Sequence, residues 1–200
     1  MRKMLLFLGA FCLIVFCIFY YKTLKNGNNI NSKSEKEFID YILNDMKEYK
    51  VNADVKIISN KTENDYKIYQ EVTNSKSTQK VLNEKDEDII EIVLENNKLK
   101  IVNQILNLEK VYEEYSTLLN NSLFLNVFLD EYKNEENSQK IYEDNGDIIL
   151  EIELVKNINT YARFKRLHIS KDTKAIKELI VLDDNKKIRA CIKYNNIEIK

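Results

Sequence analysis

The fold is decided by the stretch YARFKRLHISKDTKAIKELIVLDDNKKIRACIKY, which spans residues 161–194. It contains three β-prone segments, 161–169, 174–182 and 186–194, separated by two short polar turns. In the last segment apolar and polar side chains alternate, which is typical of a strand with one buried face. Strands joined by turns this short pair antiparallel with their neighbours, so the stretch predicts a meander.

The same alternation recurs upstream of this stretch. Val51, Ala53 and Val55 are separated by polar residues, as in a half-buried strand. Asn96 and Asn97 connect two further segments and favour a hairpin, because Asn tolerates the left-handed conformation of such turns. A sheet of eight or more strands must twist and curl, so one face becomes concave. The remaining predicted strands are 51–58, 66–72, 78–82, 89–94, 99–102 and 147–155.

Three segments have helical periodicity. Ser34 to Glu37 form a capping box, and an apolar stripe at helical spacing follows from Phe38 to Tyr49. A second apolar patch runs from Val111 to Leu119. Leu123 to Leu129 are apolar on almost every side, so a helix here must be covered all round. We interpret this last segment as a plug in the concavity, with a short buried strand as the alternative.

The predicted fold class is therefore α+β. It consists of a strongly curved, open antiparallel sheet of half-barrel form with helices in its concave face. The exported part is long enough for one domain with a real core.

An apolar run, MLLFLGAFCLIVFCIFYY at residues 4–21, precedes this domain and follows Arg2 and Lys3. A helix with a rise of about 1.5 Å per residue nearly crosses a bilayer core of about 30 Å over this length. A cleaved signal peptide would need a small-residue exit, which is missing after the run. A lipoprotein leader would need a small residue before Cys12 or Cys17, where Phe stands. We therefore predict one N-terminal transmembrane helix that acts as an uncleaved signal anchor.

The predicted organisation has three parts. Residues 1–25 form the signal anchor, 26–33 a polar linker and 34–200 the domain. Because the domain follows the anchor, we expect it outside the cytoplasm and tethered to a membrane.

Composition excludes several classes of function. Without the four basic residues at 2, 3, 22 and 25, the exported part has 27 basic and 32 acidic residues. This acidic balance argues against a nucleic-acid binder, which needs a basic face to displace counterions. Two of the three cysteines lie in the apolar run, so Cys191 has no intrachain partner in the domain. The fold must therefore be held by packing.

The candidate chemistry is sparse. His168 is the only histidine, and Cys191 could act as a nucleophile with His168 as base, but nothing in the sequence brings the two together. We interpret both as ordinary strand residues. Acidic clusters at 84–91 and 130–136 lack the spacing and glycine of a calcium loop and are interpreted as solvated surface. The sequence predicts no catalytic residue, no metal site and no cofactor, and hence a protein that is not an enzyme.

Two surface features are possible binding sites. The first is a group of basic residues that could meet an anionic wall polymer, a phospholipid head group or an acidic partner, although a solvated strand face is the favoured interpretation. The second is any exposed patch among the 12 tyrosines, which would suit a protein partner. The basic group consists of Arg163, Lys165, Arg166, Lys171, Lys174 and Lys177.

The order of elements and five short stretches carry a family resemblance. The stretches are YKVNADV at 49–55, NKLKIVN at 97–103, LHISKDT at 167–173, VLDDN at 181–185 and IKYNNIEI at 192–199. Together they resemble the strands of the LolA/LolB-like lipoprotein-carrier superfamily, and within it the GerS-related proteins of clostridial spore germination. The chain departs from that pattern by lacking a lipoprotein cleavage site and prolines in the late strands.

The resemblance implies a LolA-like fold and a non-catalytic role. GerS-related proteins bind a cell-wall amidase that modifies spore-cortex peptidoglycan, which implies a location at the cell membrane or the forespore membranes. It also implies that two copies can form a homodimer by strand exchange. The alternative function is a carrier or sensor of lipid or lipoprotein, which requires an apolar cavity in the concave face. An enzyme of unrecognised type is a third hypothesis, with His168 and Cys191 as its only candidate residues.

Overall fold

The computed structural model describes most of the chain after residue 45 and a few residues before it. It divides into two compact units, residues 1–44 and 45–200. Among the described residues, no helix is both long and apolar enough to cross a membrane. The predicted span at 4–21 and the linker at 26–33 lie outside the described part of the chain. The described residues are 37, 39–40, 42, 44, 46–83, 85, 87–96, 98–113, 123–155 and 160–199.

In the first unit, the described residues between 37 and 44 are helical. Ile39 and Ile42 are buried, whereas Asp40 and Asn44 are exposed, as expected for an amphipathic helix. The predicted stripe extends too far, because Tyr49 belongs to the first strand and pairs with its neighbours on both sides.

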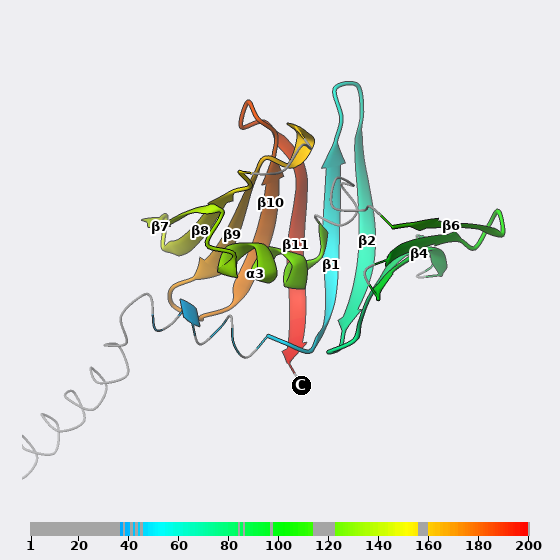
Figure 1. Ribbon diagram of the computed structural model, residues 1–200, viewed down its shortest axis with the longest axis horizontal. Helices are drawn as coiled ribbons and strands as arrows, with labels where there is room; N and C mark the ends of the chain where they lie inside the picture. The colour runs from blue at the N-terminus through cyan, green and yellow to red at the C-terminus, as the bar shows by residue number, and fades with distance from the viewer. Residues whose placement is uncertain are drawn as a thin grey trace, which may run out of the picture. The chain divides into compact units, whose positions relative to one another are not determined.

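The second unit is built on one open antiparallel sheet, whose eleven strands all lie in the described residues (Figure 1). Its order is β6-β5-β4-β3-β2-β1-β11-β10-β9-β8-β7. Two meanders therefore meet where the first and last strands pair. The strands are β1 Tyr49–Ile58, β2 Glu63–Val72, β3 Lys76–Leu82, β4 Asp88–Glu95, β5 Lys98–Asn103, β6 Leu108–Tyr112, β7 Ser138–Asp144, β8 Asp147–Glu153, β9 Phe164–Ser170, β10 Ile176–Leu182 and β11 Ile188–Ile199.

The register of the central strands gives the sheet one apolar face. In β1, Val51, Ala53 and Val55 are buried and the residues between them are exposed. Val55 lies opposite Ile192 of β11, and Ala53 lies opposite Tyr194. Both partners are buried, so the two meanders share one core. The strong twist is visible in Figure 1, where β1 and β2 run up the view and β4 and β6 run across it.

One helix, α3 (Leu125–Lys133), covers this apolar face in front of β9 to β11 and β1 (Figure 1). Leu125, Phe128, Leu129 and Tyr132 are buried along it. The predicted buried helix is thus confirmed, and the alternative of a short buried strand is wrong. We call the side of the sheet that α3 covers the α3 face, and the opposite side the outer face.

The predicted helical patch from Val111 to Leu119 is wrong where the structure describes it. Val111 and Tyr112 lie in β6, which follows a tight turn and pairs with β5. Asn107 supplies the left-handed conformation in that turn, with a φ of 49°. Residues 114–119 lie outside the described part of the chain.

Two further differences concern the second meander. The sequence predicts no strand at Ser138–Asp144, yet β7 pairs there with β8 through the turn at Asn145 and Gly146. All seven of its residues are exposed, so it carries no burial alternation to detect. Residues 161 and 162, the first two of a predicted strand, lie instead in a short 3₁₀ helix (η2, Thr160–Ala162).

Candidate functional site

The α3 face is filled by side chains where the structure describes it. Phe124 packs with Ile92 of β4 and Leu99 of β5, and all three are buried. Phe128 and Leu125 are also fully shielded from solvent. The space that a lipid chain would need at these positions is occupied by the protein itself.

Polar side chains fix the start of α3 on the first meander. The backbone N–H of Asn126 donates to the Tyr49 hydroxyl at 3.2 Å, and the Asn126 amide donates to Ser77 at 2.9 Å. The Gln70 amide donates to the carbonyl of Leu123 at 2.9 Å and to Gln79 at 2.8 Å. Buried polar groups are stable only when bonded in this way, so the network specifies where the helix begins.

A buried ion pair fixes the other half of α3 on the second meander. The Lys165 ammonium of β9 is fully buried and bonds to the carboxylate of Glu131 in α3. Burial lowers the pKa of Lys165, and Glu131 opposes that shift. This corrects the interpretation of Lys165 as part of a solvated basic face, because β9 turns it toward the helix.

Four of the other five basic residues predicted as a group also form ion pairs within the fold. Arg163 bonds to Glu153 at 3.0 Å, and Arg166 bonds to Glu151. Lys171 pairs with Glu143, and Lys177 pairs with Asp147. These ion pairs neutralise the positive charge of the four residues locally, which leaves little of it for an anionic polymer.

The outer face brings the two predicted reactive residues to one carboxylate. Glu178 of β10 lies between β9 and β11 in the sheet. The Cys191 thiol donates to one of its oxygens at 3.3 Å, and His168 Nδ1 lies 3.7 Å from the other. No local sequence pattern predicts this arrangement, because it depends on the register of three strands.

This arrangement does not activate the thiol. Burial raises the pKa of Cys191 to about 11, and the negative charge of Glu178 adds to the rise. Burial lowers the pKa of His168 below its usual value. At neutral pH the thiol is therefore protonated and the imidazole neutral. A nucleophilic cysteine needs the opposite shift of its pKa, so the geometry favours a structural role.

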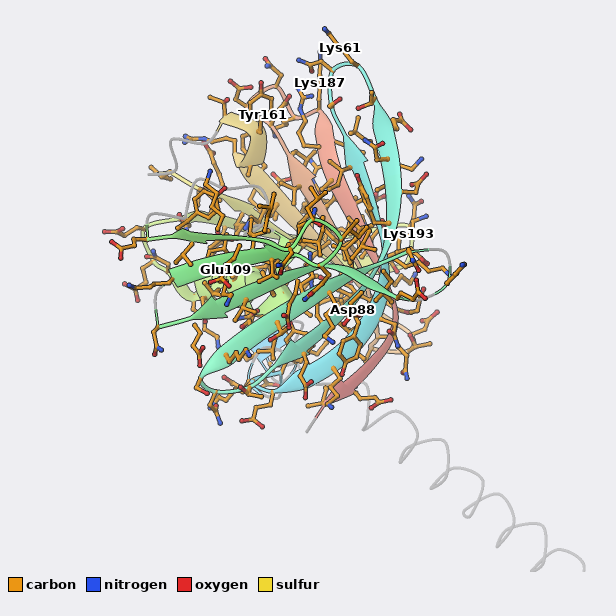
Figure 2. All side chains as sticks on the ribbon, turned by 90° about the vertical axis from the view of Figure 1, so that its right-hand side faces the viewer. Lys61, Asp88, Glu109, Tyr161, Lys187 and Lys193 are labelled. Atoms are coloured by element: carbon orange, nitrogen blue, oxygen red, sulfur yellow. The ribbon has the colours of Figure 1, made fainter. Side chains whose placement is uncertain are left out.

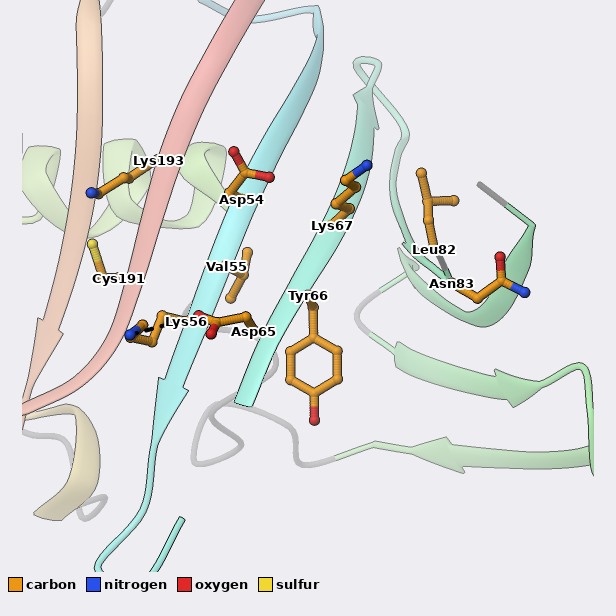
Figure 3. Close-up of a pocket in the computed structure, with 10 residues that line it drawn as sticks. All are labelled: Asp54, Val55, Lys56, Asp65, Tyr66, Lys67, Leu82, Asn83, Cys191 and Lys193. Carbon is orange, nitrogen blue, oxygen red and sulfur yellow. Dashed lines mark ion pairs between the residues drawn. The ribbon is translucent and has the colours of Figure 1, made fainter. Parts of the chain in front are cut away.

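A hollow of about 760 Å³ opens on the outer face beside Cys191 (Figure 3). Lys193 comes from β11, Asp54 from β1, and Asp65 and Lys67 from β2. Many of its charges are already paired with neighbours. The Lys56 ammonium lies 3.3 Å from a carboxylate oxygen of Glu63 and 3.9 Å from one of Asp65. The Asn195 side-chain amide donates to the Asp54 carboxylate at 3.1 Å. The hollow is therefore a shallow depression on the sheet and does not form a concentrated charge site.

The predicted acidic clusters do not converge on a metal site. Asp88 pairs with Lys80, and Glu87 accepts a hydrogen bond from Asn83. In the second cluster Glu131 forms the ion pair with Lys165, and burial raises the pKa of Asp130. Within the described ranges, no group of three or more potential metal ligands lies close enough together to hold an ion.

Four exposed apolar side chains lie on the hairpin of β5 and β6, and they include the most exposed ones among the described residues. We call residues 103–112 the edge hairpin. Ile105, Leu106, Leu108 and Val111 are exposed to 73%, 62%, 60% and 49%. Figure 2 views the sheet from this end, with Glu109 of β6 labelled. Exposed apolar side chains that are clustered in one hairpin are typical of interaction surfaces. Sequence reasoning missed this one because it assigned Val111 and Tyr112 to a helix.

No protein-family model and no curated protein matches the sequence. Solved structures with a similar fold include an uncharacterized conserved protein from Thermus thermophilus, with a TM-score of 0.49 at 9% identity over 84% of this chain and 88% of that one. A chain from the complex of the CwlD amidase with the GerS lipoprotein of Clostridioides difficile has a TM-score of 0.48 at 21% identity. The match covers 84% of this chain and 97% of that one. A LolA superfamily protein from Nitrosomonas europaea has a TM-score of 0.44 at 9% identity, over 80% of this chain and 93% of that one.

These structures include a member of the LolA superfamily and a complex that contains GerS, the two groups that the sequence resembles. Their sequence identities lie between 9% and 21%, and their TM-scores lie below 0.5. The large open antiparallel sheet with its helix is the fold expected from the resemblance.

Proposed function

We propose that this chain is a non-catalytic, extracytoplasmic binding protein that assists a cell-wall amidase. The single observation that carries the binding role is the edge hairpin, where four large apolar side chains are exposed at an open end of the sheet. A protein partner would shield these side chains from water at a favourable free energy of roughly 25 cal/mol per Å².

The partner class follows from the sequence resemblance to GerS-related proteins. The run at 4–21 would hold the domain, residues 34–200, at the membrane surface. There the edge hairpin would meet a partner that acts on the cell wall or the spore cortex.

The filled α3 face weighs against the alternative of a lipid or lipoprotein carrier. Phe124 and Phe128 occupy the concave side of the sheet, and the network at Asn126 and the ion pair at Lys165 hold α3 there. A carrier would need to displace this helix before it could accept an acyl chain.

The direct test is purification of the tagged full chain, in mild detergent, from sporulating cells. We expect a cell-wall amidase to co-purify and to remain bound through a second column. The recovered pair would then be rebuilt from separately purified proteins and measured on peptidoglycan with and without the chain. Recovery of no wall hydrolase, or an amidase that neither binds nor responds to the chain, would contradict the proposal.

A further inference from the structure

The two edges of the sheet differ in how well they resist a new strand. Unprotected edge strands invite pairing with another chain, and charged side chains discourage it. In β7 all residues are exposed, and Lys140, Glu143 and Asp144 are charged. Its Gln139 also bonds to the carbonyl of Tyr132 at the end of α3. This edge is protected on both counts.

The edge at β6 also carries charged residues, Glu109 and Lys110, but Glu109 is paired with Lys100 of β5. Within the described residues β6 pairs only with β5, so no described strand pairs with the backbone N–H and C=O groups on its second side. Leu108 and Val111 are exposed along it, and the apolar turn residues Ile105 and Leu106 extend the surface. Such an edge is a template for an added strand.

The charges of the hairpin indicate what the added strand carries. Lys100 pairs with Glu109 at 2.7 Å, and Lys98 pairs with Glu113 at 3.0 Å. Lys110 has no carboxylate partner among the described residues, and its ammonium lies 4.7 Å from the centre of the Tyr112 ring. One cation, Lys110, is therefore left on a strand whose single carboxylate, Glu109, is neutralised.

The register places this cation between two apolar side chains. Tyr112 lies opposite the buried Leu99, so Tyr112, Lys110 and Leu108 share the α3 side of the strand. A strand paired with β6 would place its own alternate side chains directly beside these three. Complementarity requires an acidic residue beside Lys110 and apolar residues beside the other two.

We propose that the partner binds by adding an extended segment to β6, with an acidic side chain beside Lys110 and apolar side chains beside Leu108 and Tyr112. This inference rests on the proposed function in that the segment belongs to a protein partner. It adds the mode of binding and the chemistry of the segment. Backbone pairing would supply affinity, and the alternate side chains would supply specificity.

Hydrogen exchange on the full chain tests the backbone part. In the free chain, every second amide of β6 points away from β5 and is expected to exchange rapidly. Binding of the purified amidase should slow those amides while leaving the amides of β7 unchanged. An amidase that binds without slowing any β6 amide would overturn strand addition and leave the proposed function standing.

Peptides test the side-chain part without the amidase. The probe is a synthetic peptide as long as β6, with alternating Val and Thr around a central Glu; its control has Lys at the centre. We expect the wild-type chain to prefer the Glu peptide by about threefold, and Lys110→Glu to reverse that preference by a similar factor. Binding with reversal supports strand addition even if no amidase is recovered.

Absence of peptide binding, or equal binding of both peptides to both chains, would overturn the inference.

A second copy of this chain is the competing occupant of the edge. Light scattering on the free chain shows whether it is a dimer, and hydrogen exchange shows whether its β6 amides are already slow. A dimer with slow β6 amides would show that a second copy pairs with β6. That result would also overturn the inference.

Discussion

Lys165 is fully buried, and Glu131 supplies its charge partner across the α3 face. Glu131→Gln leaves the ammonium buried without a carboxylate, so we expect the free energy of unfolding to fall by about 3–5 kcal/mol. Lys165→Met removes the buried charge itself and should lower the free energy of unfolding by a smaller amount. Urea denaturation measures both. The exposed Glu135→Gln is the control, with an expected change within about 0.5 kcal/mol.

The pH dependence of the Glu131→Gln variant follows from the same residue. Burial lowers the pKa of Lys165 in the folded chain, whereas in the unfolded chain it returns to 10.5. The unfolded state therefore binds more protons just below pH 10.5, and stability must rise with pH in that window. We expect the variant to recover stability as the pH approaches 10.5. A flat or falling curve relative to the wild type would contradict the buried placement of Lys165.

Cys191 offers a second test at the level of single residues. Its pKa is raised to about 11 by burial and by Glu178, so alkylation by iodoacetamide should be slow at neutral pH and accelerate near pH 11. Glu178→Gln removes the negative charge and should shift that acceleration to lower pH. A wild-type thiol that reacts rapidly at pH 7 would contradict this environment and reopen the hypothesis of an enzyme.

Helix α3 decides between a filled and an open concave face. Phe128 is fully buried along it, and Phe128→Ala should lower the free energy of unfolding by about 3–5 kcal/mol. The cavity left behind should also bind an apolar fluorescent dye that the wild type does not bind. Val155→Ala, at a half-exposed position, should change neither quantity. Dye binding by the wild type at the level of the variant would restore the carrier hypothesis.

The elements that the sequence predicted well are those with one buried face. In β1 the alternation of Val51, Ala53 and Val55 with polar residues is visible in the sequence, and the strand follows it. Leu123 to Leu129 predicted the buried helix for a different reason, because the segment is apolar on almost every side and must be covered. The edge strands β6 and β7 have no such signal, because they are largely exposed on both sides.

The candidate site was less predictable than the fold. Contacts such as Cys191 with Glu178 depend on the register between strands, which local patterns do not specify. The edge hairpin depends on which strand ends the sheet, and this is a property of the topology.

At the scale of the whole molecule, residues 4–21 predict attachment to a membrane. We expect the full chain to remain in the membrane pellet after carbonate extraction at high pH, because an apolar span is held by the bilayer core and not by charge. A variant that begins at residue 26 should be released. Sequencing the mature N-terminus provides the check, since a start beyond Lys25 in the wild type would make the chain a secreted protein.

The central claim is that the edge hairpin receives the partner. Val111 on β6 and Val155 after β8 are almost equally exposed, at 49% and 50%, so Val111→Lys and Val155→Lys form a matched pair. The decisive measurement is the dissociation constant of each full-length variant with the purified amidase. We predict that Val111→Lys weakens binding by roughly tenfold or more and that Val155→Lys binds like the wild type. Equal affinities for all three chains would contradict the account.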